Sequence, residues 1–419
     1  MQKLIIKGIR ELRGSIFISG SKNATLPILA ASILANKVKL KNVPLVKDIF
    51  TMVELLNFIG LRINLIKNKN IIEITNEKRN INTLAPYKLV KTMRAGVLVL
   101  GSLLTKYGKA KVSLPGGCAI GTRPVDLHLL VLKKLGAKVK IKDGYIFAEA
   151  KKGLKGTTVK FPSISVGATE NALLASIKAK GKTILKNCAI EPEVKDLITF
   201  LKKLGANINI QGRTITILES KIKNSKISHE VIFDRIELGT YMIAGSLLAK
   251  KNLSINGINP KIVKSEIDIL RKIGVQIQIK KTSIIIKRNK KLKKINATTK
   301  PYPGFPTDLQ AQLMVLLTQA NGTSKIKEDI FENRFMHVPE LKRMGANIEI
   351  KNKSAIIKGP TKLTGAEVMA ADLRGSVSLV LAGLVAENRT IINRIYHLDR
   401  GYEFLEKKLK KCKAKIKRI

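Results

Sequence analysis

The sequence is poor in the residues from which metal centres, disulfide frameworks and base-stacking surfaces are built. Its 419 residues include three Cys, four His and no Trp, and aromatic residues make up only 4% of the chain. The residues Cys118, Cys188 and Cys412 are odd in number and widely spaced, which excludes a disulfide framework and the common zinc motifs. We therefore expect a protein of the reducing cytoplasm that holds no metal and needs no cofactor.

Long apolar runs are also missing. None approaches the roughly 18 residues that a membrane-spanning helix needs, and residues 1–15 lack the apolar core of a signal peptide. No P-loop, dinucleotide-binding motif or serine-hydrolase elbow occurs. These absences predict a protein without a membrane partner, whose chemistry depends on other residue types.

Acidic residues are scarce, since 30 Asp and Glu stand against 78 Lys and Arg and leave a net charge of +48. Such a charge would attract nucleic acid. However, only 17 of the basic residues are Arg, and an excess of Lys, Ile and Asn is typical of drift in genome base composition. The few aromatic residues also offer poor platforms for stacked bases. We therefore expect no specific nucleic-acid partner, and each Arg raises the question of why it is not Lys.

A sixfold repeat is the strongest pattern present. The segment LKKLGAKVKI at 132–141 recurs as LKKLGANINI at 201–210, and four looser copies complete the set. Each copy predicts an amphipathic helix that ends in a left-handed Gly and is followed by alternating strands. In the sixth copy Lys413 replaces the Gly, which predicts a frayed or differently capped last helix. The Gly positions are 60, 136, 205, 274 and 345.

A second repeated element is a run of small and apolar residues, which predicts a helix buried on all sides. We expect an α/β fold with these helices inside and the sheets outside, an inside-out α/β barrel. Two domains of three units suit the size of one core better than a single ring of six, and a stacked solenoid is the other alternative. The runs are 26–36, 97–108, 171–181, 241–251, 311–322 and 377–388.

Polar and charged residues gather just before five of these runs. Helix N-termini that lie side by side would form a site for anions. The alternative for Ser21, Thr169, Thr307 and Asp372 is simple N-capping. Capping does not explain the cations at these starts, which the helix dipole disfavours unless an anion is bound. These cations are Lys22, Arg94 and Arg374.

The Gly-rich segment 115–130 places Cys118 five residues before Arg123. An exposed thiol near a guanidinium has a lowered pKa and can act as nucleophile or general acid. The alternative is a small buried residue, which is our interpretation of Cys188, and Cys412 is interpreted as structural.

Carboxylates and arginines supply the remaining candidates. Asp308 and Asp372 can accept protons. Arg334, Arg374 and Arg400 have the pattern of bidentate clamps for carboxylate or phosphate. Their alternative is a surface Asp–Arg pair of little energetic weight.

These motifs together resemble the UDP-N-acetylglucosamine 1-carboxyvinyltransferases, enolpyruvyl transferases of the EPSP synthase-like superfamily. The resemblance covers essentially the whole chain and implies six βαβαββ repeats in two domains. The implied domain limits are 22–232 for one domain and 1–21 with 233–419 for the other. The motifs are SGSKNATLPILAAS, MRAGVLVLGSLL, LPGGCAIGTRPVDLHL, PYPGFPTDLQAQ, FENRFMHVPELKRMGA, ADLRGSVSLVLAGL and LDRGYE.

The resemblance implies transfer of the enolpyruvyl group of phosphoenolpyruvate to UDP-N-acetylglucosamine with release of phosphate, the first committed step of peptidoglycan synthesis. It assigns Lys22, Arg123 and Arg400 to the phosphate of phosphoenolpyruvate. It assigns Arg334 and Arg374 to the carboxylate.

The same resemblance implies the acid–base chemistry. Asn23 would support the tetrahedral intermediate, and Asp308 would take the proton of the sugar 3-hydroxyl. Cys118 would protonate the methylene carbon, form a covalent adduct with phosphoenolpyruvate and be alkylated by the antibiotic fosfomycin. A monomer is expected. The implied substrate contacts also include Arg94, Pro124, Val125, Asp126, Leu127, Ser163, Ile164, Ser165, Val166, Ile330 and Asp372.

Two other functions stay open at this point. A 3-phosphoshikimate 1-carboxyvinyltransferase shares the fold and the phosphoenolpyruvate chemistry, but the Cys118 segment favours the UDP-sugar enzyme. A non-enzymatic, polyanion-binding repeat protein would explain the charge but neither the Cys118 segment nor the clusters at the helix starts.

Overall fold

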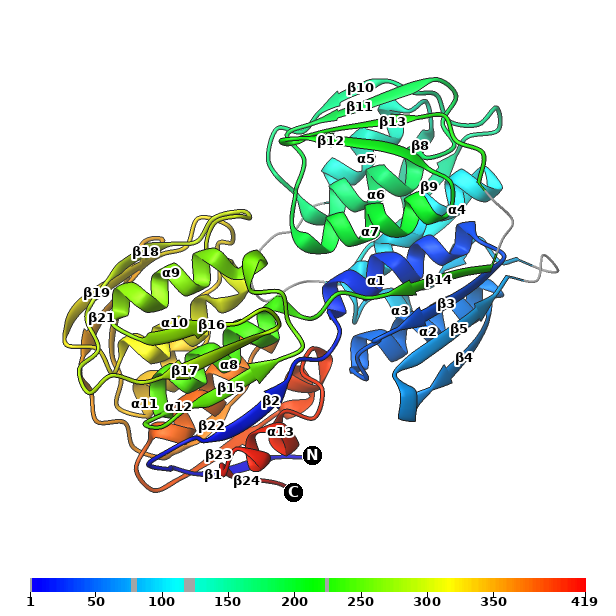
Figure 1. The fold of residues 1–419 in the computed structure, drawn as a ribbon. Coiled ribbons are helices and arrows are strands. Elements are labelled where there is room, and N and C mark those ends of the chain that lie inside the picture. Colours follow the sequence, from blue (N-terminus) through cyan, green and yellow to red (C-terminus); the bar gives the residue numbers. More distant parts are fainter. Residues whose placement is uncertain (1, 77–80, 117–124, 223–225) are drawn as a thin grey trace. The chain divides into compact units, whose positions relative to one another are not determined.

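The computed structural model describes residues 2–76, 81–116, 125–222 and 226–419. The chain divides into two compact units. Of the described residues, 20–76, 81–116, 125–222 and 226–232 form the middle unit, and 2–19 with 233–419 form the terminal unit (Figure 1). The domain limits 22–232 and 1–21 with 233–419 stay a prediction.

The middle unit contains three four-stranded sheets. Its helices are α1 (Lys22–Ala31), η1 (Ser32–Leu34), α2 (Lys47–Ile59), η2 (Lys67–Lys69), α3 (Tyr87–Val90), η3 (Arg94–Leu98), α4 (Val99–Tyr107), α5 (Asp126–Lys134), α6 (Val166–Ser176) and α7 (Pro192–Lys203). Its strands are β3 (Lys37–Lys41), β4 (Arg62–Ile66), β5 (Ile71–Thr75), β6 (Leu84–Ala85), β7 (Lys109–Ser113), β8 (Lys138–Lys142), β9 (Tyr145–Glu149), β10 (Thr158–Lys160), β11 (Lys182–Lys186), β12 (Asn207–Gln211), β13 (Thr214–Leu218) and β14 (Lys226–Glu230).

The terminal unit also contains three four-stranded sheets. Its helices are α8 (Arg235–Leu248), η4 (Pro260–Val263), α9 (Lys264–Ile273), η5 (Thr307–Leu309), α10 (Gln310–Leu317), α11 (Val338–Arg343), α12 (Leu373–Val385), η6 (Ile395–Arg400) and α13 (Leu405–Lys411). Its strands are β1 (Leu4–Lys7), β2 (Gly14–Phe17), β15 (Leu253–Asn256), β16 (Gln276–Ile279), β17 (Ser283–Lys287), β18 (Asn296–Thr298), β19 (Gly322–Lys327), β20 (Asn347–Lys351), β21 (Ser354–Gly359), β22 (Glu367–Met369), β23 (Arg389–Asn393) and β24 (Lys415–Arg418).

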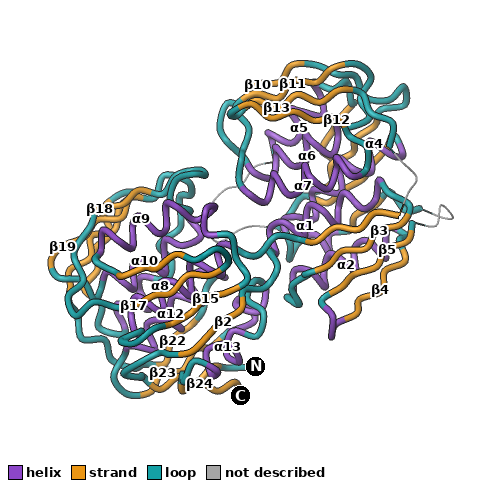
Figure 2. Tube along the Cα trace, in the orientation of Figure 1, coloured by secondary structure: helices purple, strands orange, loops and turns teal. Residues whose placement is uncertain are grey.

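All six sheets have one design. In the sheet β6-β7-β9-β8, the first two strands are parallel and the others pair antiparallel. A parallel pair needs a crossover, which here contains the apolar helix of the repeat, whereas the antiparallel neighbours β8 and β9 are joined by a short turn. Within each unit the apolar helices of the repeats lie inside, and the strands lie outside them (Figure 2). The predicted inside-out α/β fold with six repeats is confirmed.

The chain changes unit twice, and the repeats at these points exchange their first strands. The strand β2 precedes α1 in sequence but pairs with β15 in the terminal unit. In the same way β14 precedes α8 but pairs with β3 in the middle unit. Each unit therefore completes one sheet with a strand that is distant in sequence from the rest of that sheet.

An ion pair between Lys408 and the buried Glu237 holds Ser19, the last residue of the first segment of the terminal unit. The Lys408 Nζ lies 2.6 Å from Glu237 Oε1 and 2.6 Å from Ser19 Oγ. The backbone N–H of Ser19 donates to Glu237 Oε2 at 2.8 Å, and that of Asp234 donates to the Ser19 carbonyl at 2.8 Å. Burial raises the pKa of Glu237 to about 7, against the stabilising contacts of Lys408 and Ser19. The end of the first chain segment is thereby tied to α8 and α13.

The helices have the two predicted characters. Every residue of the interior helix α8 is buried, whereas the outer helix α9 buries only one face, which includes Ile267, Leu270 and Ile273. Among the described residues, no helix is long and apolar enough to cross a membrane. Cys188 and Cys412 are fully buried, which fits their structural interpretation, and burial raises the pKa of their thiols to about 12 and about 11.

The outer helices end as predicted at five Gly residues, all with positive φ. The expectation for Lys413 was wrong, because this residue adopts the same left-handed conformation with φ 71°. Its N–H bonds to the Lys410 carbonyl at 2.9 Å, just as the N–H of Gly205 bonds to that of Lys202 at 2.9 Å. The hydrogen bonds of the last turn therefore hold a Lys in a conformation that favours Gly.

We predict that Lys413→Gly raises the free energy of unfolding. Relief of the left-handed strain is worth about 1–2 kcal/mol, and the greater chain entropy of an unfolded Gly offsets about half of it. Urea unfolding should show a gain of about 0.5–1 kcal/mol. Gly205→Lys, the reverse change in the third repeat, should lose a similar amount. No gain in the first variant would contradict the strain argument.

Candidate functional site

In the middle unit, the start of α1 combines a cap with a buried cation. The Ser21 hydroxyl accepts a hydrogen bond from the N–H of Ala24 at 3.3 Å, so Ser21 is an N-cap. The Lys22 Nζ lies 3.2 Å from Asp48 Oδ2, and both side chains are nearly buried. An internal carboxylate thus offsets the repulsion between Lys22 and the helix dipole. Asn23, the next residue, is half-buried.

Arg94 stands at the start of η3, which contacts both α1 and α6. It affects the nearby imidazole of His128, because burial and then the charge of Arg94 lower the pKa of His128 to about 4. The neutral ring fits its contact, in which Asn171 Nδ2 donates to His128 Nδ1 at 3.0 Å. The element η3, which begins at Arg94, therefore lies against both α1 and α6 within this unit.

Residues 163–165 precede α6, which begins at Val166, and all four lie at or near the surface. Ser165 caps α6 through its hydroxyl, which accepts from the N–H of Ala168 at 3.3 Å. Thr169, which we considered as a cap, instead lies one turn inside, where its hydroxyl donates to the Ser165 carbonyl at 2.8 Å. Val125 is buried, and Asp126, which is exposed, begins α5, followed by half-buried Leu127. Cys118, Arg123 and Pro124 lie outside the described residues.

In the terminal unit, two arginines converge on Asp308. Arg334 Nη2 lies 2.5 Å from Asp308 Oδ1, and Arg374 Nη2 lies 2.7 Å from Asp308 Oδ2. The arginine side chains are only 4% and 5% exposed, whereas Asp308 is 26% exposed. Two guanidinium groups thus hold one carboxylate that still reaches the surface. The alternative of a weak surface pair does not hold for Arg334 and Arg374, because both side chains are buried.

A hydrogen-bond network centred on Tyr402 also holds the guanidinium group of Arg374. Its Nη1 donates to the Tyr402 hydroxyl at 3.2 Å, and the guanidinium carbon lies 5.5 Å from the Tyr402 ring centre. Tyr402 OH also contacts Thr240 Oγ1 at 2.9 Å and Gln312 Nε2 at 3.3 Å. Burial would lower the pKa of Arg374, but the charges of Asp308 and the other nearby acidic groups outweigh it and raise that pKa. Arg374 therefore stays charged although it is buried.

Glu328 connects two other predicted positions. Its Oε1 accepts from the N–H groups of Ile330 and Phe331 at 2.8 and 3.1 Å, and its Oε2 accepts from the Thr307 hydroxyl at 2.9 Å. Thr307 is therefore not the N-cap we considered, but a tether between η5 and the turn at Ile330. The ring of Phe331 lies 5.6 Å from the guanidinium carbon of Arg334.

Asp372 is an N-cap, and Arg400 is the last residue of η6. The Asp372 carboxylate accepts from the N–H groups of Arg374 and Gly375 at 3.0 and 3.1 Å, so it is already used by the start of α12. The helix η6 contacts α12, and burial together with the charge of Arg400 lowers the pKa of His397. The structure thus brings Asp308, Arg334 and Arg374 together and places Arg400 on a neighbouring element.

Sequence reasoning missed several partners. Asp48 lies within an ordinary outer helix, so nothing in the pattern indicated that it pairs with Lys22. Tyr402 follows Arg400 by two residues in the LDRGYE motif and could have been noticed there. Asp234, which caps α8 through the N–H groups of Ile236 and Glu237, shows a readable signal, since Asp followed three residues later by Glu is a capping-box pattern.

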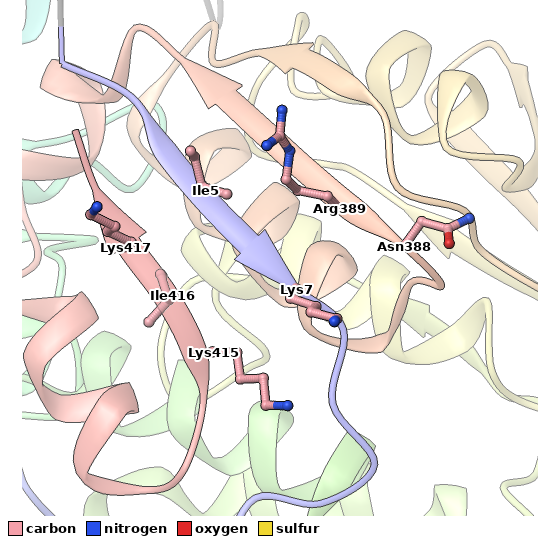
Figure 3. Close-up of a pocket in the computed structure, with 7 residues that line it drawn as sticks. All are labelled: Ile5, Lys7, Asn388, Arg389, Lys415, Ile416 and Lys417. Carbon is pink, nitrogen blue, oxygen red and sulfur yellow. The ribbon is translucent and has the colours of Figure 1, made fainter.

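A shallow groove of about 540 Å³ lies on the outer face of the sheet that contains β1, β23 and β24 (Figure 3). Lys7, Arg389 and Lys415 lie directly opposite one another on these strands. No predicted site residue lines the groove. Among the described residues, no group of three or more His, Cys, Asp or Glu could hold a metal ion.

Comparison with known proteins gives one consistent result. A family model described as EPSP synthase (3-phosphoshikimate 1-carboxyvinyltransferase) matches residues 6–409. The chain is 59% identical over 420 residues to the UDP-N-acetylglucosamine 1-carboxyvinyltransferase of Pelagibacter ubique (strain HTCC1062), with all of both chains covered. It is 51% identical, again over the full length of both, to the protein of that name from Rickettsia akari (strain Hartford).

Solved structures agree on the fold. The enolpyruvyl transferase NikO from Streptomyces tendae matches with a TM-score of 0.90 and 26% identity, covering 100% of this chain and 98% of its own. An EPSP synthase from Acinetobacter baumannii matches with a TM-score of 0.78 over 100% and 99% of the two chains. At 17% identity, the second likeness concerns the fold alone.

We predict that Asp308→Asn lowers the free energy of unfolding by about 2 kcal/mol, because it leaves two buried guanidinium groups without their carboxylate. Millimolar inorganic phosphate should restore more stability to this variant than to the unchanged protein, since an anion can replace the lost charge. The measurement is urea unfolding with and without phosphate.

The matched control is Asp329→Asn in the same unit. Its carboxylate pairs with Lys327 at the surface, so the loss should stay within about 0.5 kcal/mol. Equal effects of the two substitutions, or no extra gain from phosphate, would contradict a special role for the Asp308 cluster.

Proposed function

The chain belongs to the UDP-N-acetylglucosamine 1-carboxyvinyltransferases of the EPSP synthase family, and from this premise we propose that it transfers the enolpyruvyl group of phosphoenolpyruvate to the 3-hydroxyl of UDP-N-acetylglucosamine. The other product is phosphate, and the reaction is the first committed step of peptidoglycan synthesis. The observation that carries the proposal is the 59% identity over the whole chain to a protein of that name.

The arginine pair around Asp308 supports a role in holding phosphoenolpyruvate. Arg334 and Arg374 present planar donor groups to one carboxylate of the protein at 2.5 and 2.7 Å, and the carboxylate of the substrate has the same shape and charge. Lys22, Arg123 and Arg400 hold its phosphate. Arg suits the bidentate contacts, because Lys has no planar fork of donors.

Asp308 has two states in this proposal. While both arginines hold it, its negative charge is stabilised and its oxygens are occupied, which makes it a weak base. When the substrate's carboxylate engages Arg334 and Arg374, Asp308 regains its basicity and takes the proton of the sugar 3-hydroxyl. Binding of one substrate thereby prepares the base that activates the other.

The chemical steps follow from Asp308 as base and Cys118 as acid. The 3-oxygen bonds to C2 of phosphoenolpyruvate as Cys118 gives its proton to C3, which forms a tetrahedral intermediate supported by Asn23. The thiolate of Cys118 then takes a proton back from C3, the C2–C3 double bond re-forms, and the bond between C2 and the phosphate oxygen breaks. Phosphate leaves with the electrons of that bond, and the bond from C2 to the sugar 3-oxygen is kept. A covalent adduct of Cys118 with phosphoenolpyruvate belongs to the same chemistry.

The UDP-sugar contacts are taken residue by residue from the resemblance. Ser165 and its neighbours suit such a role because they stand at or near the surface beside the start of α6, where N–H groups attract anions. A monomeric, cytoplasmic enzyme stays a prediction. The proposed UDP-sugar contacts are Arg94, Arg123, Pro124, Val125, Asp126, Leu127, Ser163, Ile164, Ser165, Val166, Asp308 and Ile330.

We predict phosphate release from phosphoenolpyruvate that depends on UDP-N-acetylglucosamine. Shikimate 3-phosphate, the acceptor of the related enzyme, should give no release above background, because the full-length relatives carry the UDP-sugar name. A phosphate-release assay with both acceptors measures this directly. Turnover with shikimate 3-phosphate would overturn the proposed acceptor but leave the enolpyruvyl chemistry.

We also predict that Cys118→Ser loses at least about 100-fold in kcat, the usual contribution of a general acid. A serine hydroxyl is a far weaker acid, and it should not be alkylated by fosfomycin. Phosphate release and mass spectrometry after fosfomycin treatment test both points. The control Cys188→Ser, at a buried position, should keep the fosfomycin adduct on Cys118. Unchanged turnover of Cys118→Ser would exclude its acid role.

A further inference from the structure

The penultimate residue, Arg418, uses all five of its N–H donors. Two bonds run to Asp399, from Nη2 to Oδ1 at 2.7 Å and from Nη1 to Oδ2 at 2.9 Å. Two more run to Glu406, from Nε at 3.0 Å and from Nη2 at 3.2 Å, and the fifth runs from Nη1 to Gln2 Oε1 at 3.0 Å. This arrangement is two bidentate carboxylate pairs on one guanidinium, the strongest form of such contacts.

Only Arg can make this set of bonds. A Lys has three donors on one nitrogen and cannot bind two carboxylates through parallel pairs. The surrounding strand β24 is otherwise Lys-rich, with Lys415 and Lys417 beside Arg418. The hydrogen bonds to Asp399, against a partly opposing effect of burial, raise the pKa of Arg418. Its charge is therefore permanent.

The partner Asp399 directly precedes Arg400 on η6. This segment lies between two non-Gly residues in the left-handed conformation, Arg394 with φ 56° and Phe404 with φ 47°. Within it, Tyr402 bonds to Arg374. Through Tyr402 this segment is bonded to the Asp308 network. Through Asp399 it is also bonded to Arg418, the last residue of β24, which is not part of that network.

We propose that Arg418 is a positioning residue for phosphoenolpyruvate binding, acting through Asp399 to hold the backbone of η6 and with it the Arg400 side chain. This inference rests on the proposed role of Arg400. A guanidinium must be placed within a few tenths of an ångström for a bidentate phosphate contact, so a loosened η6 weakens binding of this substrate in particular.

The alternative is a purely structural role, because Arg418 also joins β24 to α13 and to the start of the chain. A structural role would reduce the amount of folded enzyme, or weaken both substrates together. A positioning role instead raises the KM for phosphoenolpyruvate and leaves the KM for UDP-N-acetylglucosamine unchanged. A rise in the KM for phosphoenolpyruvate without a rise in the KM for the UDP-sugar therefore distinguishes the positioning role from the structural role.

The test is Arg418→Lys, which keeps the charge but breaks the paired bonds. We expect a rise of about 5- to 10-fold in the KM for phosphoenolpyruvate, a less than twofold change for the UDP-sugar, and cooperative unfolding. In an Arg400→Lys background the same substitution should add nothing, because the group it positions has already been lost.

Two controls complete the design. Arg271, on the outer helix α9 of the same unit, donates one bond to the Ile277 carbonyl, which Arg271→Lys removes. Glu406→Gln removes the second carboxylate partner of Arg418 but keeps Asp399. Both should leave the KM for phosphoenolpyruvate within about twofold. An equal rise in Glu406→Gln would mean general loosening of the last strand and would overturn the inference.

The outcomes also separate the inference from its premise. If Arg400→Lys leaves the KM for phosphoenolpyruvate unchanged, the proposed role of Arg400 and the inference fall together. If Arg400→Lys raises this KM but Arg418→Lys does not, or if the two effects add in the double variant, the inference alone falls.

Discussion

The full burial of the interior helices is the constraint on which the rest of the structure depends. A helix buried on every side can present only its ends, so chemistry must come from the first turn and from the loop before it. The starts of α1, η3 and α6 in the middle unit, and of η5 and α12 in the terminal unit, carry many of the candidate residues. The sheets on the outside close the core, and in the described part of the chain no proposed site residue lies on a strand.

The same constraint explains why charges at these starts are paired within the protein. A cation near a helix N-terminus and out of contact with water is costly without a counter-charge. Lys22 has Asp48, while Arg334 and Arg374 share Asp308. The internal carboxylates pair with the cations in the protein itself, and in the proposed function an anionic substrate competes for the same cations. That proposal makes stability without substrate and affinity for substrate depend on the same groups.

Much of the fold could be predicted because the same sequence signals recur in each of the six repeats. Six apolar runs and five Gly residues at equivalent positions indicated the interior helices and the ends of the outer helices. Lys413 misled because a missing Gly lowers preference for the left-handed conformation but does not forbid it when the last-turn hydrogen bonds remain. The partners of the site cations were beyond reach, since Asp48 and Tyr402 approach them only through tertiary packing.

The surplus of Lys makes the arginines informative. At most surface positions a solvated ammonium serves as well as a guanidinium, so a drift towards Lys meets little resistance. Replacement of Arg by Lys is disfavoured where several donors must lie in one plane. Arg334 and Arg374 meet this condition around Asp308. Arg418 meets it between Asp399 and Glu406. The net charge of +48 therefore says little about function by itself. Its informative part is the small set of guanidinium groups that Lys could not replace.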